Sequence, residues 1–555
     1  MNRQNSLWQG CRTFSLEVIL LVLAIIAVAI PAAHAQTYSV LYDFGTKSSD
    51  PRNPSFSGIV AQGRDGNLYS TAPLGGTTGN GAMFMITPGG TLTVPYSFDA
   101  TDAQPYSGLT LGTDGNFYGT TYNGGSSSLG NVFKLTPTGT LTVLHDFAGS
   151  DGSNPYAPPI QGTDGNFYGT TTQYEITGAG TVYKITPAGK FTMLYSFDGT
   201  HGQNPQAPLV QGTDGNLYGT TQAGGSSSAG VVYKITASGK LTVIHSFDGG
   251  SHGGHPSGGP LVQGSDGNFY GTAACCGSIG GGVVFKITAA GQFTVLHNIN
   301  ATTDGSNPLA GLVQATDGNF YGTTYGGGTK SDGTIFRISP TKPYAYKVLY
   351  NFDGTTGSSP QVTFLQHTNG ILYGDTSTGG NINNISDGVF YSLSLGLKPF
   401  VSLVSTSGKV GTTVEILGQG FTGTKGVSFN GTAAKFKVSS ATYLTATVPN
   451  GATTGSVTVT TPGGKLTSNK IFRVTPQIIS FKPTSGSVGT LVTITGVSLI
   501  QTKKVTFGGV IATSFKVNSD TQVTANVPTG AKTGKIAITT AGGIAVSPGV
   551  FTVTQ

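Results

Sequence analysis

Short runs of alternating hydrophobic and polar residues recur along most of the chain, each run ending at Gly, Asp, Asn or Pro. Leu141 to His145 is one such run, and its alternation is typical of a half-buried β-strand. Between residues 208 and 247 the pattern predicts four strands in succession, over residues 208–212, 216–221, 231–236 and 241–247. The bias toward Ala, Glu, Lys and Leu that is typical of long helical proteins is missing, so we expect an all-β protein.

The four-strand pattern repeats about every fifty residues. The string Asp-Gly-Asn begins at six positions spaced 49 to 52 residues apart, and a degraded copy, Thr368-Asn369-Gly370, follows. The six positions are Asp65, Asp114, Asp164, Asp214, Asp266 and Asp317. Four strands in about fifty residues are the signature of a β-propeller blade. The strand count predicts a seven-bladed β-propeller over residues 36–398.

The fourth strand of the last repeat is missing after residue 395, and a matching strand stands alone at residues 38–44. We therefore expect the first strand of the mature chain to complete the last blade. Such closure leaves no free sheet edge, which would otherwise be open to aggregation.

The clearest line of the repeat, Asp-Gly-Asn-Phe/Leu-Tyr-Gly-Thr-Thr, resembles the Gloeobacter/Verrucomicrobium (GloVer) tandem repeat of bacterial exported proteins. The resemblance covers roughly residues 36–398. It implies an exported location and no particular activity.

A second repeat, with a period of 78 residues, begins near residue 399. The segment 407–412 recurs at 485–490, and 427–431 recurs at 505–509. Each copy has the length and turn pattern of a small sandwich of about seven strands. Both copies resemble IPT/TIG domains, which are immunoglobulin-like modules of extracellular and DNA-binding proteins. We expect two such immunoglobulin-like β-sandwich domains, at 399–475 and 476–555.

Residues 1–35 have the features of a signal peptide. Arg3 and Arg12 supply positive charge, residues 18–30 are nearly all apolar, and Ala33-His34-Ala35 fits a cleavage site. We expect a secreted, periplasmic or cell-surface protein with no transmembrane segment after cleavage; an uncleaved N-terminal anchor is the alternative. Export also makes nucleic acid an unexpected partner.

The chain is rich in glycine and poor in charged residues, and its charge is unevenly distributed. Glycine contributes 87 of 555 residues and charged residues only 9%, against about 25% in ordinary domains. Residues 36–398 contain 14 Lys and Arg against 20 Asp and Glu, whereas residues 399–555 contain 13 against 2. The sandwiches therefore carry a net +11, which favours binding of an acidic polymer or membrane surface. Solubility alone would also explain lysines that spread over every face.

The repeated polar residues have structural interpretations. We expect the Asp-Gly-Asn aspartates to form tight turns, with a ring of cation ligands as the alternative. A glutamine recurs on the first strand of most repeats, and we expect it to hydrogen-bond between blades or to line the axial channel. These glutamines are Gln62, Gln161, Gln211, Gln263, Gln314 and Gln366.

The variable loops carry the candidate ligand-binding residues. The connections from the fourth strand to the next first strand, and from the second strand to the third, emerge on one face of a propeller. Their tyrosines suit stacking on sugar rings, although they could also cap their own loops. They are Tyr106, Tyr122, Tyr156, Tyr174 and Tyr325.

Four further residues in the loops of this face suggest a specific metal site. His252 and His255 lie in one loop of the fifth repeat, and Cys275 and Cys276 lie in another loop of the same face. Two imidazoles and two thiolates would suit zinc or copper. The adjacent cysteines could instead form a vicinal disulfide or remain free thiols.

Function follows from the loops and the missing catalytic motifs. No nucleophile elbow, zinc-protease motif or phosphate loop is present, and no cofactor or catalytic residue is predicted. We expect a non-enzymatic protein that binds carbohydrate or another surface polymer, with the sandwiches as spacer or attachment unit. One alternative is a polysaccharide lyase or glycosidase, for which Glu175, Asp332 and Asp387 are the candidate carboxylates. Another is a purely structural, adhesive role.

Overall fold

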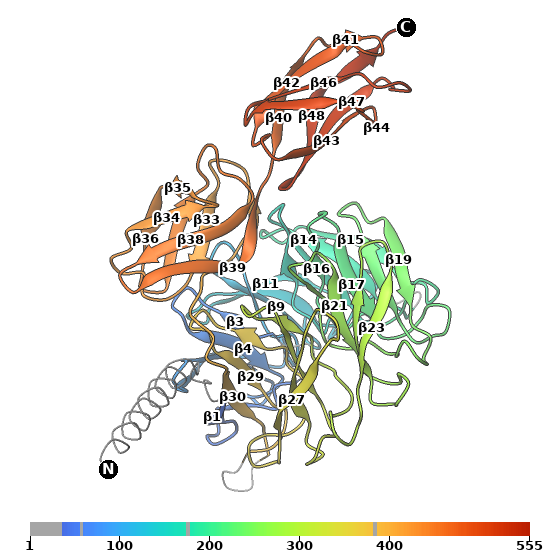
Figure 1. Ribbon diagram of the computed structural model, residues 1–555. Helices are drawn as coiled ribbons and strands as arrows, with labels where there is room; N and C mark the ends of the chain where they lie inside the picture. The colour runs from blue at the N-terminus through green and yellow to red at the C-terminus, as the bar shows by residue number, and fades with distance from the viewer. Residues whose placement is uncertain (1–35, 56–58, 174–177, 381–385) are drawn as a thin grey trace, which may run out of the picture.

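The structure is a computed structural model that describes residues 36–55, 59–173, 178–380 and 386–555. These residues form strands, turns and loops, and none of them is helical. The expected signal peptide lies outside the described residues. Figure 1 shows a large propeller-like domain built from repeated sheets, followed by two smaller β-sandwiches.

The described residues of the propeller-like domain form seven four-stranded antiparallel sheets, numbered here 1 to 7 in chain order. The first strands are β3 (Ala61–Gln62), β8 (Thr110–Leu111), β12 (Ile160–Gln161), β16 (Val210–Gln211), β20 (Val262–Gln263), β24 (Val313–Gln314) and β28 (Leu365–Gln366). The second strands are β4 (Leu68–Ala72), β9 (Phe117–Thr121), β13 (Phe167–Thr171), β17 (Leu217–Thr221), β21 (Phe269–Ala273), β25 (Phe320–Thr324) and β29 (Leu372–Asp375). The third strands are β6 (Ala82–Ile86), β10 (Asn131–Leu135), β14 (Thr181–Ile185), β18 (Val231–Ile235), β22 (Val283–Ile287), β26 (Thr334–Ile338) and β30 (Val389–Ser394). The fourth strands of sheets 1 to 6 are β7 (Leu92–Ser97), β11 (Leu141–Asp146), β15 (Phe191–Ser196), β19 (Leu241–Ser246), β23 (Phe293–Asn298) and β27 (Tyr346–Asn351).

The fourth strand of sheet 7 comes from the start of the described chain. β1 (Thr37–Asp43) pairs antiparallel with β30 from Thr37↔Ser394 to Asp43↔Val389, with one irregularity near Val40. Tyr38 of β1 also stacks on Tyr350 of sheet 6, with ring centroids 3.9 Å apart. The prediction that this strand completes the last sheet is confirmed. A small additional sheet joins β2 (Pro51–Arg52) and β5 (Leu74–Gly75).

The Asp-Gly-Asn segments are tight turns between the first and second strands. In sheet 2, Asp114 accepts hydrogen bonds from the backbone N and Nδ2 of Asn116 and from the hydroxyl of Tyr118. Gly115 has φ +85°, a left-handed conformation that favours glycine. The other five Asp-Gly-Asn aspartates accept the same three hydrogen bonds. Turn formation therefore explains these residues.

The turn tyrosines and the glutamines connect neighbouring sheets. The ring of Tyr118 in sheet 2 stacks on Phe167 in sheet 3, with centroids 3.8 Å apart. Gln161 accepts a hydrogen bond from the backbone N of Thr113 at 2.9 Å. Equivalent glutamine bonds cross five further junctions, including the one between sheets 7 and 1, where Gln62 accepts from Thr368 N at 3.1 Å. Bonding between sheets, one of the two expected roles, is therefore what the glutamines do.

Each sandwich consists of two packed sheets around its own hydrophobic core. The first contains β31 (Ser402–Leu403), β32 (Ser407–Gly408), β33 (Thr413–Leu417), β34 (Gly426–Phe429), β35 (Thr432–Ala434), β36 (Phe436–Val438), β37 (Tyr443–Thr447), β38 (Gly455–Thr461) and β39 (Gly464–Val474). The second contains β40 (Gln477–Lys482), β41 (Ser485–Gly486), β42 (Leu491–Val497), β43 (Thr502–Phe507), β44 (Val510–Ile511), β45 (Phe515–Ser519), β46 (Gln522–Asn526), β47 (Gly534–Thr540) and β48 (Gly543–Val553). The two have the same strand order, as their sequence repeat predicts.

The first sandwich docks on the face formed by the Asp-Gly-Asn turns, which we call the turn face. Arg64 of sheet 1 forms an ion pair with Glu415, with Nη2 and Oε1 2.5 Å apart. Arg473 donates to the carbonyl of Thr213 in sheet 4 at 2.6 Å. Gln419 donates to Oγ1 of Thr368 in sheet 7 at 2.9 Å. These contacts reach sheets 1, 4 and 7, so the sandwich spans the turn face, and the opposite face carries the long loops.

The pairing of β1 with β30 generates a prediction about stability. Deleting residues 36–44 should expose the backbone of β30 and cause aggregation or a marked loss of thermal stability, because an unpaired strand edge pairs with other chains. The milder substitution Phe44→Ala should lower the free energy of unfolding by about 3–5 kcal/mol, since Phe44 is 1% exposed.

Denaturant unfolding and light scattering measure both effects. Leu74→Ala is the control, because Leu74 is 41% exposed and its truncation should change stability little. If the deletion variant unfolds at the same denaturant concentration as the chain of residues 36–555, β1 does not close the domain.

Candidate binding face

The loops opposite the turn face are held by a recurring proline corner. Before each proline stands a residue in the left-handed region, for example Gln104 with φ 60° and Asn154 with φ 54°. The proline then packs on a glycine of the preceding sheet: a Cβ added to Gly130 would lie 2.9 Å from Cδ of Pro155. The residue after the proline is thereby placed at a fixed position in each loop, and in sheets 2 and 3 that residue is tyrosine.

Three of the predicted tyrosines come together on this loop face. The ring centroids of Tyr106 and Tyr122 are 5.6 Å apart, those of Tyr106 and Tyr156 are 5.6 Å apart, and those of Tyr122 and Tyr156 are 4.7 Å apart. All three side chains are partly exposed. We call Tyr106, Tyr122 and Tyr156 the tyrosine cluster. It presents aromatic surface and hydroxyl groups together, which is what sugar recognition requires.

The hydroxyls of Tyr106 and Tyr156 are neutral hydrogen-bonding groups. Burial raises the pKa of Tyr106 above its ordinary value, and the neighbouring Tyr122 adds to the effect. Burial likewise raises the pKa of Tyr156, with further contributions from Tyr122 and Tyr106. Two hydrogen bonds hold the backbone of Tyr122: its N donates to the carbonyl of Gln104 at 3.0 Å, and Asn154 Nδ2 donates to its carbonyl at 3.1 Å. Tyr122 is thus held by its backbone, and its ring contacts those of Tyr106 and Tyr156.

Of the other two candidate tyrosines, only Tyr325 lies within the described residues, and it does not join the cluster. Tyr325 lies in the equivalent loop of sheet 6 and is 39% exposed. Its backbone N donates to the carbonyl of Asn307 at 3.0 Å. Tyr174 lies outside the described residues.

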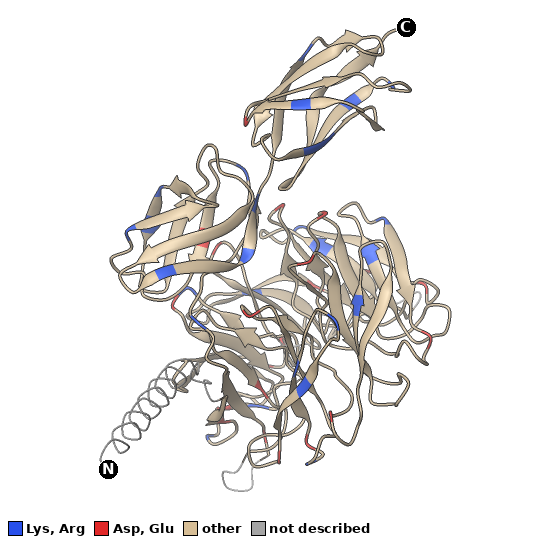
Figure 2. Ribbon diagram, viewed as in Figure 1, with Lys and Arg blue, Asp and Glu red and all other residues tan. Residues whose placement is uncertain are grey.

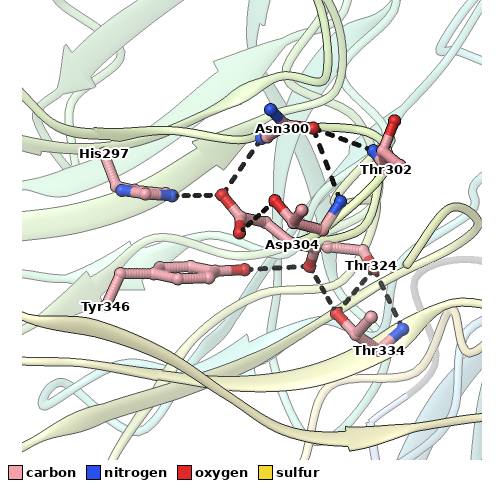
Figure 3. Close-up of polar contacts among 8 residues, drawn as sticks. His297, Asn300, Thr302, Asp304, Thr324, Thr334 and Tyr346 are labelled. Atoms are coloured by element: carbon pink, nitrogen blue, oxygen red, sulfur yellow. Dashed lines mark hydrogen bonds and ion pairs between the residues drawn. The ribbon is translucent and has the colours of Figure 1, made fainter. Parts of the chain in front are cut away.

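Polar residues within the loops are engaged in anchoring them. Figure 3 shows one such anchor, between sheets 5 and 6: His297 Nε2 lies 2.8 Å from Oδ2 of Asp304. The carbonyl of Asp304 accepts hydrogen bonds from the hydroxyls of Thr334 and Tyr346. Burial tends to raise the pKa of Asp304, but the bonds from His297, Asn300 and Thr303 outweigh it and lower the pKa. Asp304 is therefore an ionised structural group.

The two candidate carboxylates of a glycosidase that the structure describes have protein partners. Asp332 Oδ1 accepts a hydrogen bond from the hydroxyl of Ser358 at 2.7 Å. Asp387 pairs with Arg52, with Oδ2 and Nε 3.4 Å apart. Glu175 lies outside the described residues. Both described carboxylates thus hold loops of the face in place.

Each of the four candidate metal ligands contacts another group. Cys275 and Cys276 are bonded to each other as a vicinal disulfide, which is one of the alternatives left open by the sequence. His255 Nδ1 lies 3.0 Å from the carbonyl of Gln222, whereas the ring of His252 packs against His245 and Phe293. Among the described residues no three His, Cys, Asp or Glu side chains gather as a metal site. While Cys275 and Cys276 are bonded to each other, neither can supply a thiolate to the hypothesised metal site.

Cys276 occupies a position that favours glycine. Its φ is +68°, and the equivalent residues of sheets 2 and 4 are Gly124 and Gly224, with φ +88° and +81°. The bond to Cys275 holds this left-handed conformation without glycine.

A thiol titration tests the disulfide. The native chain of residues 36–555 should give no reactive thiol, and the same chain treated with reductant should give two. The Cys275→Ser/Cys276→Gly variant, which restores glycine at the left-handed position, is the matched control and should give none under either condition. Two thiols in the untreated native protein would contradict the disulfide.

Asp375 is a residue that the sequence analysis missed. It ends β29, where the equivalent residue of sheets 1 to 6 is threonine, such as Thr120 or Thr323. Its side chain is 0% exposed, and neither carboxylate oxygen has a hydrogen-bond partner among the described residues. Burial raises the pKa of Asp375 to about 8. The departure from the repeat was the signal that could have identified it.

Asp375→Thr should stabilise the protein, and more so at higher pH. The unfolded carboxyl ionises near pH 4 while the folded one keeps its proton until about pH 8. The free energy of unfolding therefore falls between these values, by up to about 1.4 kcal/mol per pH unit. Threonine does not ionise, so the variant should lack this decrease in the free energy of unfolding with rising pH.

Thermal unfolding of both proteins at pH 5 and pH 8 measures the difference. Thr120→Ser is the control, because it changes the equivalent residue of sheet 2 without adding or removing a charge. Its thermal stability should differ from that of the wild type by the same amount at both pH values. A gain from Asp375→Thr that is equal at pH 5 and pH 8 would show that Asp375 is already ionised in the folded protein.

The fold and the loops define a modular β-repeat protein, with repeated propeller-like sheets followed by two immunoglobulin-like sandwiches. The model of the Gloeobacter/Verrucomicrobia repeat matches residues 29–174 and 155–391, which is more than half of the chain. The chain belongs to this repeat family. The IPT/TIG domain matches residues 399–473 and 476–553, so both sandwiches are IPT/TIG domains. The resemblances noted in the sequence are thus confirmed.

Comparison with curated proteins finds no match. Solved structures with similarity include a fungal alcohol oxidase of the AA5 family in complex with copper, at a TM-score of 0.38 and 16% identity, covering 91% of this chain and 98% of that one. A gluconolactonase from Xanthomonas campestris has a TM-score of 0.35 at 13% identity, covering 53% and 88%. A surface glycan-binding protein from Prevotella bryantii has a TM-score of 0.22 at 20% identity, covering 27% and 41%. Similarities of this size carry no argument about ligand or activity.

Within the described ranges, the structure has no helix of the length and apolar character needed to span a membrane.

Proposed function

We propose that this protein is an exported or cell-surface carbohydrate-binding protein without catalytic activity. The seven sheets are the blades of one closed seven-bladed propeller, its loop face binds a glycan, and the two IPT/TIG domains act as spacer or attachment unit. The single observation that carries the proposal is the tyrosine cluster, three rings within 5.6 Å of one another on the loop face.

The chemistry of the cluster supports a sugar ligand. A sugar ring offers apolar C–H surface to an aromatic face and hydroxyls to polar groups at the same time. Beside the rings, Asn123 Nδ2 donates to Gln104 Oε1 at 2.7 Å. In the next sheet Gln206 and Asn204 both donate to Gln222 Oε1, at 3.2 and 2.6 Å. Amides beside aromatic rings supply directional hydrogen bonds along an elongated ligand.

The arrangement of the domains supports the same function. The first IPT/TIG domain is docked on the turn face, so a large ligand approaches the propeller from the loop face. Lys and Arg residues mark both sandwiches in Figure 2, in keeping with their net charge of +11, and this charge favours retention on an acidic surface.

A glycan array probed with the mature chain, residues 36–555, tests the proposal. The mature chain should bind a defined set of glycans. The Tyr106→Ala/Tyr122→Ala/Tyr156→Ala variant should lose about tenfold in affinity for each ring that contacts the sugar, because each stacking contact contributes about 1.5 kcal/mol.

Tyr325→Ala is the matched control, because Tyr325 lies on the same face but outside the cluster. Unfolding curves check that each variant is folded. Binding of no glycan, or equal affinity of the triple variant and the wild type, would overturn the proposal.

A further inference from the structure

The docked IPT/TIG domain leaves a cleft open on the turn face. The cleft has a volume of about 570 Å³ and lies between the turns of sheets 5 and 6, the linker at 396–400 and β39. This volume falls within the range of small-ligand sites. It lies on the face opposite the tyrosine cluster, so it is a separate site.

Hydrogen bonds hold the walls of the cleft in place on both sides. Phe400 N donates to the carbonyl of Thr368 at 3.0 Å, and Val401 N donates to the carbonyl of Thr467 at 3.2 Å, so the linker is held by both domains. On the propeller side, Gln314 Nε2 donates to the carbonyl of Gly318 at 3.0 Å. Asp317, which also lines the cleft, accepts hydrogen bonds from Asn319 and Tyr321, so the lining carries one carboxylate beside its lysines.

Two lysines, one from the linker and one from the first sandwich, line this cleft. Lys398 comes from the linker and Lys465 from β39, and both are exposed and line the cleft. None of the ion pairs in the described part of the chain uses a lysine. Asn469 and Thr467 add an amide and a hydroxyl to the same lining. With two lysines against one aspartate, the lining has an excess of positive charge, and it offers hydrogen-bond donors beside that charge.

We propose that this cleft binds an anionic saccharide unit, with Lys398 and Lys465 pairing with its carboxylate or sulfate group. This inference rests on the proposed function and deepens it, because it places the contact with an acidic polymer at one cleft rather than over all the lysines of the sandwiches. Ammonium groups converging on one anion bind more strongly than dispersed surface lysines, since a single ligand neutralises both. Amides and hydroxyls of the lining bind the sugar hydroxyls.

Calorimetric titration of the mature chain at low salt tests the site with three probes. These are a polygalacturonate oligosaccharide for carboxylate, a heparin oligosaccharide for sulfate and a maltohexaose as the neutral glycan. At least one anionic probe should bind at least tenfold more tightly than the neutral one, and the stronger of the two identifies the anion. Lys398→Gln/Lys465→Gln should reduce this affinity at least tenfold.

Two matched variants separate the outcomes. Lys504→Gln/Lys535→Gln removes the same charge from the second sandwich and should change affinity less than twofold; an equal loss would show diffuse charge and overturn the site. The triple alanine variant of the tyrosine cluster should keep its affinity for the anionic probe. If that variant loses the anionic probe while Lys398→Gln/Lys465→Gln keeps it, the ligand binds the loop face, which overturns the cleft and leaves the proposed function standing. Absence of anionic binding at low salt also overturns the cleft, whatever the glycan array shows for the tyrosine cluster.

Discussion

Contact between neighbouring sheets is the interaction on which the rest of the protein depends. A single four-stranded sheet of this repeat has two apolar faces, and each must be covered by another sheet. The Gln161 carboxamide and the Tyr118 ring show how this is done, by a bond to the preceding sheet and a stack on the following one. Because each sheet is stabilised by its neighbours on both sides, the last sheet needs the first. β1 supplies the strand that completes sheet 7, and Gln62 supplies the bond across the junction.

Departures from the repeat mark the places where a sheet does something besides packing. Sheet 2 has Leu111 where most sheets have glutamine, and at that junction Arg64 donates instead to the carbonyl of Thr113 and pairs with Glu415 of the first sandwich. The degraded turn of sheet 7 presents Thr368, which accepts from Gln419. The tyrosine cluster, the vicinal disulfide and Asp375 are further departures. Each is set in a backbone that the unchanged repeat residues hold in place.

Much of the fold could be predicted from the sequence, since strand alternation and turn residues are local signals. The expected strands at 208–247 match β16 to β19 to within two residues at each end. Counting the strands of each repeat also identified the sheet that the lone strand near Tyr38 completes. The candidate site could be predicted only in part. The loops that carry Tyr106, Tyr122 and Tyr156 follow from the topology, but the distances between the rings depend on the proline corners. The docking of Glu415 on Arg64 joins residues 351 positions apart in the chain, and no local pattern reports such a contact. Asp375 was missed because its burial depends on how the sheets pack together, which the local sequence does not report.

The central claim is that the loop face is where the protein meets its glycan. Hydrogen–deuterium exchange of the mature chain, measured by mass spectrometry with and without a glycan that binds on the array, tests this claim most directly. The account predicts slower exchange on binding within residues 104–109, 122–130 and 154–159, and unchanged exchange in the Asp-Gly-Asn turns beneath the first sandwich, at Arg64 to Asn67. Protection confined to the turn face or to the second sandwich, with the three loops unchanged, would contradict it.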